Sequence, residues 1–142
     1  MASVLGVNAT KAADPIAANI LDPGTLGGKV RVLVDSYEAA ALAAGSDITI
    51  GKALPSGAII VGIAIATDAL GAGVTVEVGD ANTSDLYLAA TVCTSATSTN
   101  AIATDGLGYV VGTAADDDTI LVTTGVGAAT GTIKVVVTYV VE

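Results

Sequence analysis

Residues 54–80 read LPSGAIIVGIAIATDALGAGVTVEVGD, and this stretch decides the fold class. A Leu-Pro-Ser-Gly turn precedes an apolar run over residues 58–67, which is typical of a central strand buried on both faces. A loop containing Asp and Gly follows. Residues 74–79 then alternate between valine and other residues, the pattern of a half-buried strand. The stretch therefore predicts two β-strands joined by a loop.

The same pattern continues on both sides of this stretch. Residues 29–37 place Val30, Val32 and Val34 on one face and Arg31, Leu33 and Asp35 on the other. Residues 36–45, SYEAAALAAG, fit either one or two helical turns capped by Gly45 or a continuing strand. Further strands are expected at residues 46–51, 86–92, 108–112, 119–125 and 132–141. About eight short strands separated by Gly, Asp and Asn predict a single all-β sandwich or barrel domain over residues 29–142.

Composition narrows the function classes. Of the 142 residues, 52% are hydrophobic but only 13% are charged, so a lone subunit has little polar surface, and we expect part of its apolar surface to be buried against other subunits. The net charge is −9 with only five Lys and Arg, which argues against binding nucleic acid or anionic lipid. We expect neither a nucleic-acid partner nor a membrane, and the N-terminus lacks the pattern of a signal peptide.

Residues 1–28 differ from the rest of the chain. Asp-Pro pairs and a Gly-Gly pair punctuate them, and their apolar residues follow no period. This composition predicts an extended N-terminal arm that a neighbouring chain holds in place. The candidate contact residues in the arm are Val4, Leu5, Val7, Ile16, Ile20 and Leu21.

Two acidic stretches are the candidate metal sites. Residues 80–85, DANTSD, begin like an EF-hand loop but lack its turn glycine and its bidentate glutamate, because Asp85 and Thr91 occupy those positions. We expect a turn in which the Asp and Asn side chains bond the local backbone. Residues Asp116–Asp118 fit a solvated loop, with a structural cation shared between chains as the alternative. Neither stretch supports assigning a metal ligand.

No catalytic constellation is found. The chain has no His, so the usual Ser and Cys triads cannot form, and its one cysteine, Cys93, is expected to pack as a small hydrophobic residue. Residues 125–131, GVGAATG, precede a strand rather than a helix, so we expect a hairpin loop with glycines at positive φ instead of a dinucleotide site. We predict a protein that is not an enzyme and has no cofactor.

Residues 54–90 resemble a group of small tailed-phage virion proteins. The shared order is a Leu-Pro-x-Gly turn and strand, an Asp-Ala-Leu-Gly loop, a strand ending in Gly-Asp, an acidic turn and a Tyr-Leu strand; ATGTIKVVVTYV at residues 129–140 fits the same pattern. The resemblance covers about half of the chain and rests on turn residues. It implies a β-sandwich or jelly-roll subunit that decorates a phage head, with the arm as an anchor.

From the resemblance we expect a virion structural protein of the capsid decoration, or cement, type. It would be made in the host cytoplasm, lie on the capsid surface as a homotrimer and bind the major capsid protein. Alanine- and valine-rich strand faces are expected at the trimer centre. A head-fibre, neck or tail component is the alternative of the same kind. A calcium-dependent adhesin module is the alternative of a different class.

Overall fold

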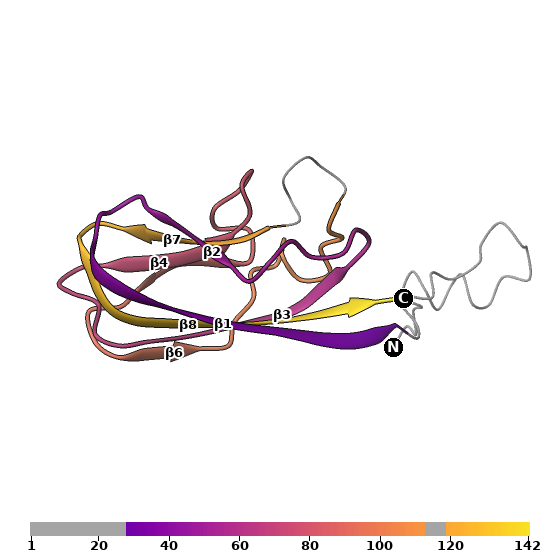
Figure 1. The fold of residues 1–142 in the computed structure, drawn as a ribbon, viewed down its shortest axis with the longest axis horizontal. Coiled ribbons are helices and arrows are strands. Elements are labelled where there is room, and N and C mark those ends of the chain that lie inside the picture. Colours follow the sequence, from indigo (N-terminus) through magenta and orange to yellow (C-terminus); the bar gives the residue numbers. More distant parts are fainter. Residues whose placement is uncertain (1–27, 113–118) are drawn as a thin grey trace, which may run out of the picture.

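The computed structural model describes residues 28–112 and 119–142, and this part of the chain folds as two layers of β-sheet (Figure 1). Eight strands form two four-stranded antiparallel sheets, and the described residues contain no helix. The strands are β1 Lys29–Leu42, β2 Asp47–Ile50, β3 Ile59–Thr67, β4 Thr75–Gly79, β5 Leu88–Val92, β6 Thr97–Thr99, β7 Ile120–Gly125 and β8 Ala129–Val141. The all-β sandwich prediction is confirmed.

The strand order identifies the sandwich as a jelly roll. One sheet has the order β1-β8-β3-β6 and the other has the order β2-β7-β4-β5. The first strand therefore pairs with the last, the second with the seventh, the third with the sixth and the fourth with the fifth. Rolling up one long antiparallel hairpin of eight strands gives this nested pairing, and it defines the jelly roll. Of the two architectures that the strand pattern allowed, the sandwich is correct.

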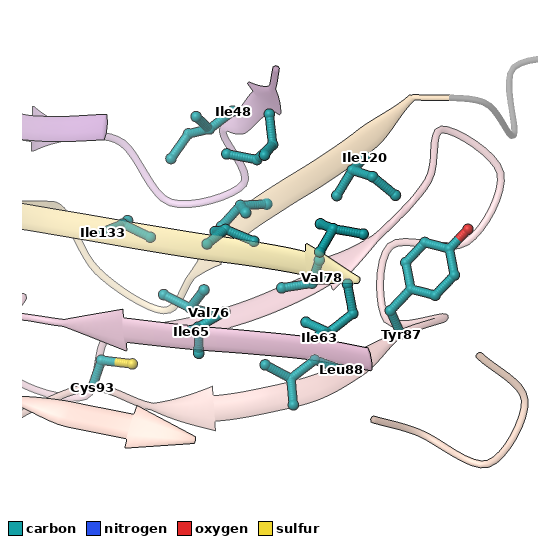
Figure 2. Close-up of a cluster of buried hydrophobic side chains, with 14 of the residues drawn as sticks. Ile48, Ile63, Ile65, Val76, Val78, Tyr87, Leu88, Cys93, Ile120 and Ile133 are labelled. Atoms are coloured by element: carbon teal, nitrogen blue, oxygen red, sulfur yellow. The ribbon is translucent and has the colours of Figure 1, made fainter. Parts of the chain in front are cut away.

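Alternating side chains bury one face of each sheet. In β4, Val76 and Val78 are buried and Glu77 between them is not, because successive side chains of a strand point to opposite faces. In β8, Ile133, Val135 and Val137 are buried in the same way. The core between the sheets is built mainly from Ile and Val side chains of both layers (Figure 2). Tyr87 and Tyr109 add an edge-to-face ring pair with centroids 5.9 Å apart.

The expectation that residues 58–67 are buried on both faces is wrong. In β3, Ile63 and Ile65 point into the core, but Gly62, Ala64 and Ala66 are only half-buried and lie on the outer face. A bulge between Ile60 and Gly62 shifts the register against β8 at the start of this strand. A sandwich has only two layers, so even a central strand keeps one face without a covering layer.

The ambiguous residues 36–45 continue strand β1 as far as Leu42. The register against β8 breaks between Ala39 and Leu42, where Ala41 takes a positive φ of 55°. Gly45, with a φ of 76°, then turns the chain, and its N–H donates to the Thr124 carbonyl at 2.6 Å. This irregular segment carries the chain from one sheet to the other, from β1 to β2.

One expected strand is wrong, and one strand was missed. Residues 108–112 form only an isolated bridge between Val110 and Ile59, although Ile60 N–H donates to the Tyr109 carbonyl at 2.9 Å. The true sixth strand is Thr97–Thr99, which pairs with the end of β3. Its three polar residues have no apolar alternation, so the sequence pattern gives no signal for it. The count of eight is confirmed, but this assignment is not.

Candidate functional site

The acidic loop between β4 and β5 is a turn that bonds itself. Asp80 is buried, and one of its carboxylate oxygens accepts hydrogen bonds from the backbone N–H groups of Asn82 at 2.8 Å and Thr83 at 2.7 Å. Asp80 N–H in turn donates to the Thr83 carbonyl at 3.0 Å. The predicted turn, in which an acidic side chain bonds the local backbone, is confirmed at Asp80. This carboxylate supports the loop backbone, and its geometry is that of a structural turn.

Other candidate metal sites gain no support from the described residues. Within residues 28–112 and 119–142, no three His, Cys, Asp or Glu side chains lie close enough together to hold an ion. The predicted acidic loop Asp116–Asp118 lies outside the described residues. Cys93 is buried in the core, as predicted, and its thiol lies 3.4 Å from the Thr91 carbonyl (Figure 2).

The glycine-rich residues 125–131 are not a hairpin loop. Gly125 ends β7 and Ala129 begins β8, and those strands belong to different sheets, so residues 126–128 cross between the two layers. Positive φ values occur at Val126 (70°) and Gly131 (124°), whereas Gly125 and Gly127 keep ordinary backbone conformations. The nested pairing of a jelly roll requires this crossing, which local sequence cannot distinguish from a tight turn. The prediction that a strand follows, rather than a helix, is confirmed.

A shallow depression of about 520 Å³ lies at the end of the sandwich where β1 begins and β8 ends. Its lining combines apolar residues, among them Leu33, Leu54 and Pro55, with the cationic Arg31 and Lys52 and the anionic Glu142. The charges of Arg31 and Lys52 are partly offset by Glu142, and no Ser, Thr or Cys among the lining residues stands beside a general base. This depression therefore offers contact chemistry rather than catalysis.

The two outer faces of the sandwich differ sharply in polarity. On the β2-β7-β4-β5 sheet, Thr123 lies opposite Asp47 on one side and Glu77 on the other, and its hydroxyl donates to Asp47 at 2.7 Å. On the β1-β8-β3-β6 sheet, the outward positions of the β1–β8 pair between Val30 and Val34 are valine except for Thr138. One face is thus acidic and suited to water, whereas the other is apolar and has no covering layer among the described residues.

We call this surface the valine face and define it by outward residues of three adjacent strands: Val30, Val32, Val34, Val136, Val140 and Ala64, with Thr138 of β8 lying between Val32 and Gly62. The three β1 valines are 64%, 57% and 69% exposed, in chain order. The other three are half-buried because they lie in the middle of the sheet. Contiguous apolar surface of this kind marks contact with another protein more often than a scattered exposed valine does.

Polar residues close one end of the valine face. Along the β1–β8 pair, Ser36 lies opposite Lys134, and Glu38 lies opposite Thr132. The Thr132 hydroxyl donates to a Glu38 carboxylate oxygen at 2.7 Å, so this part of the sheet is satisfied by its own hydrogen bonds. The apolar stretch is therefore confined to the half of β1 nearest Lys29.

The sequence pattern correctly placed Val30, Val32 and Val34 on one face of a strand. It did not identify that face as the outer one, because Leu33 on the opposite face is equally apolar. In the structure, Leu33 packs against the core and Ala39 is buried. The predicted contact residues of the arm, Val4, Leu5, Val7, Ile16, Ile20 and Leu21, lie outside the described residues.

Comparisons with known proteins point to phage capsids. No protein-family model matches the chain, and no curated protein matches it. A chain in the structure of the cyanophage Pam1 capsid asymmetric unit is 29% identical, with a TM-score of 0.69, and the match covers 92% of this chain and 96% of that chain. A chain in the capsid structure of Ralstonia phage GP4 is 25% identical, with a TM-score of 0.63, over 81% and 86% of the two chains. These structural neighbours are phage capsid proteins.

Proposed function

We propose that this chain is a capsid decoration, or cement, protein of a bacteriophage, a non-enzymatic virion component that stabilises the head by bridging capsid subunits. The observation that carries the proposal is the match to a chain of the Pam1 capsid, which spans nearly the whole of both chains. The neighbour is therefore a chain of similar length with the same jelly-roll core. Such a small chain fits an accessory subunit on a shell better than the subunit that builds the shell.

Adhesion is the proposed mechanism, and the surface chemistry supports it. A stiff two-layered block presents an apolar valine face on one side and an acidic, hydrated face on the other. Burying apolar surface contributes roughly 25 cal/mol per Å² before the costs of association are subtracted. Because a capsid repeats the same site many times, an oligomer that engages several sites at once gains avidity without any new contact.

In this proposal the protein is a homotrimer on the capsid surface, bound to the major capsid protein and made in the host cytoplasm. Closed symmetry hides apolar surface that a subunit with 13% charged residues cannot keep in water. Three subunits also match the local threefold positions of an icosahedral lattice. The acidic sheet, with Asp47 and Glu77, would then face solvent.

Residues 1–28 are proposed to anchor the trimer as an arm distinct from the jelly-roll domain. Replacing Val7, Ile16 and Ile20 together by Ser in the full chain tests this, because it removes apolar contacts without shortening the protein. We expect the variant to keep the β-sheet circular dichroism spectrum and to lose affinity for capsids. Unchanged saturation of capsids would refute the anchoring role.

The decisive experiment for the proposed function is binding to particles that lack this protein. We expect saturable binding with many copies per particle and a rise in the temperature at which the heads release their DNA. Binding of only a few copies at one vertex would favour the head-fibre, neck or tail alternative. A calcium-dependent adhesin module would instead lose stability on addition of a chelator and would not bind particles.

A further inference from the structure

We propose that residues 14–22 of the arm dock in the depression where β1 begins and β8 ends, on their own subunit. These residues read DPIAANILD, an apolar stretch between two aspartates. The inference rests on the anchoring arm of the proposed function and deepens it, because it assigns a binding surface to one segment of that arm. Val4, Leu5 and Val7 are left to contact the capsid.

The depression is one part of a longer groove. A second hollow of about 410 Å³ adjoins it, and the two share Pro55, Val141 and Glu142 in their linings. The second hollow adds Ile59 and Val110 to the lining. A groove of this length, lined largely by apolar residues, suits a segment of chain that carries several apolar side chains.

The arm joins the jelly roll beside this groove. The described part of the chain begins at Gly28, and the next residue, Lys29, pairs with Val141, which lines both hollows. Leu21 lies seven residues before Gly28. Seven extended residues span up to about 24 Å, whereas β1 rises only about 13 Å from Lys29 to Leu33, the last residue of β1 in the lining. The segment can therefore reach the groove of its own subunit.

A short connection favours the subunit's own groove over that of another copy. A segment tied within a few residues of its binding site has an effective concentration in the millimolar range. The connecting residues include Pro23-Gly24 and Gly27-Gly28, pairs that favour turns and allow the chain to reverse its direction. A segment that is already docked also has less conformational freedom to lose when the protein binds a capsid, which lowers the cost of association.

The charges of the segment and the groove are complementary. The segment carries two negative charges, those of Asp14 and Asp22, and no positive charge. The depression is lined by Arg31 and Lys52 against the single carboxylate of Glu142, so its lining has an excess of positive charge on a chain whose net charge is −9. Complementary charge favours this surface over the acidic outer sheet, which would repel the segment.

A pair of cysteines tests the docking in the full-length protein. Ile20→Cys places a thiol on the segment, and Ala53→Cys places one at an exposed position of the groove lining, whereas the native Cys93 is buried. As the two thiols form a disulfide, oxidised glutathione takes up their two electrons and two protons and becomes two molecules of glutathione. The control pair combines Ile20→Cys with Ala44→Cys, which is also exposed and lies beyond the far end of β1.

We expect the protein with Ile20→Cys and Ala53→Cys to form an internal disulfide, seen as the loss of two thiols with the mass of a single chain after denaturation. The disulfide should form at least about tenfold faster than in the control pair. A disulfide that joins two copies, or equal rates for the two pairs, would overturn the inference. Saturable binding of the wild type to particles would still support the proposed function in either case, so the two failures are distinguishable.

Thiol reactivity gives a second measurement that needs no cross-link. Docking should shield the thiol of Ala53→Cys from iodoacetamide, and Ile20→Ser, which removes apolar contact area from the segment, should speed its alkylation at least about threefold. The same Ile20→Ser change should leave the alkylation of Ala44→Cys unaltered. If Ile20→Ser has no effect on the alkylation of Ala53→Cys, the segment does not occupy the groove and the inference is wrong.

Discussion

Replacing Gly79 by Ala tests the structure of the acidic loop most sharply. Gly79 ends β4, and a Cβ atom built on it would lie 2.6 Å from the Ser84 carbonyl oxygen and closer still to the Thr83 carbonyl oxygen. Both atoms belong to the backbone, so no side-chain rotation relieves the clash, and the loop must move by about an ångström or more. That movement stretches the two bonds from the Asn82 and Thr83 N–H groups to Asp80, which are 2.8 and 2.7 Å long.

Hydrogen bonds to a charged acceptor contribute about 1.5–3 kcal/mol each, and overpacking adds about 1–3 kcal/mol. We therefore expect Gly79→Ala to lower the free energy of unfolding by about 3 kcal/mol or more in urea denaturation.

The control is Gly62→Ala in β3, where the nearest heavy atom to a new Cβ is 3.7 Å away and φ is not positive. It should change stability by less than about 1 kcal/mol. Both proteins are measured at one concentration, because stability of an oligomer depends on it. If Gly79→Ala were as stable as Gly62→Ala, the loop could not be packed on Gly79 as described.

Three further predictions follow from buried and charged side chains. Calorimetry with calcium should give no saturable heat at micromolar concentrations, because the buried Asp80 oxygen already accepts two N–H groups; a one-site isotherm removed by Asp80→Ala would contradict this. Thr67→Val should raise the free energy of unfolding by about 1 kcal/mol, because the buried Thr67 hydroxyl has no hydrogen-bond partner in the described part of the protein. Thr124→Val should lower the free energy of unfolding by a similar amount, because the Thr124 hydroxyl donates to the Ala43 carbonyl at 3.2 Å. Equal effects of the two substitutions would refute this difference in hydrogen bonding. The N–H of Gly51, and then that of Ser36, lower the pKa of Asp35. The stabilising contribution of Asp35 is therefore present above about pH 4 and is lost as the pH falls through the lowered pKa. Urea titrations should show that Asp35→Asn is less stable than wild type at pH 7 and that the difference disappears in acid.

The fold class was predictable because alternation of apolar and polar residues depends only on neighbouring positions. Residues 74–79 and 119–125 gave strands β4 and β7 for this reason. Strand β6 was missed because its three polar residues, Thr97–Thr99, pair at a sheet edge without facing the core on alternate positions. The crossing at residues 125–131 was misread as a hairpin because a short glycine-rich segment has the same composition whether its strands pair or separate.

The candidate site was harder to predict than the fold. Sequence showed the alternation of Val30, Val32 and Val34, but the choice of outer face depends on how Leu33 and Ala39 meet the second sheet, which is tertiary information. The turn at Asp80 was predicted correctly, because an Asp side chain that accepts from the N–H groups two and three residues further on is a local feature. The contrast between an acidic and an apolar outer face emerged only when strands distant in sequence were placed side by side.

A three-dimensional reconstruction of the phage particle would show where this chain lies on the virion. We expect this jelly roll on the outer surface of the head, in groups of three around the local threefold axes. Valine-rich strand faces should lie at the centre of each group, and Asp47 and Glu77 should face solvent. A chain found singly, away from any threefold axis, or confined to one vertex as part of the neck or tail, would contradict the cement-protein account.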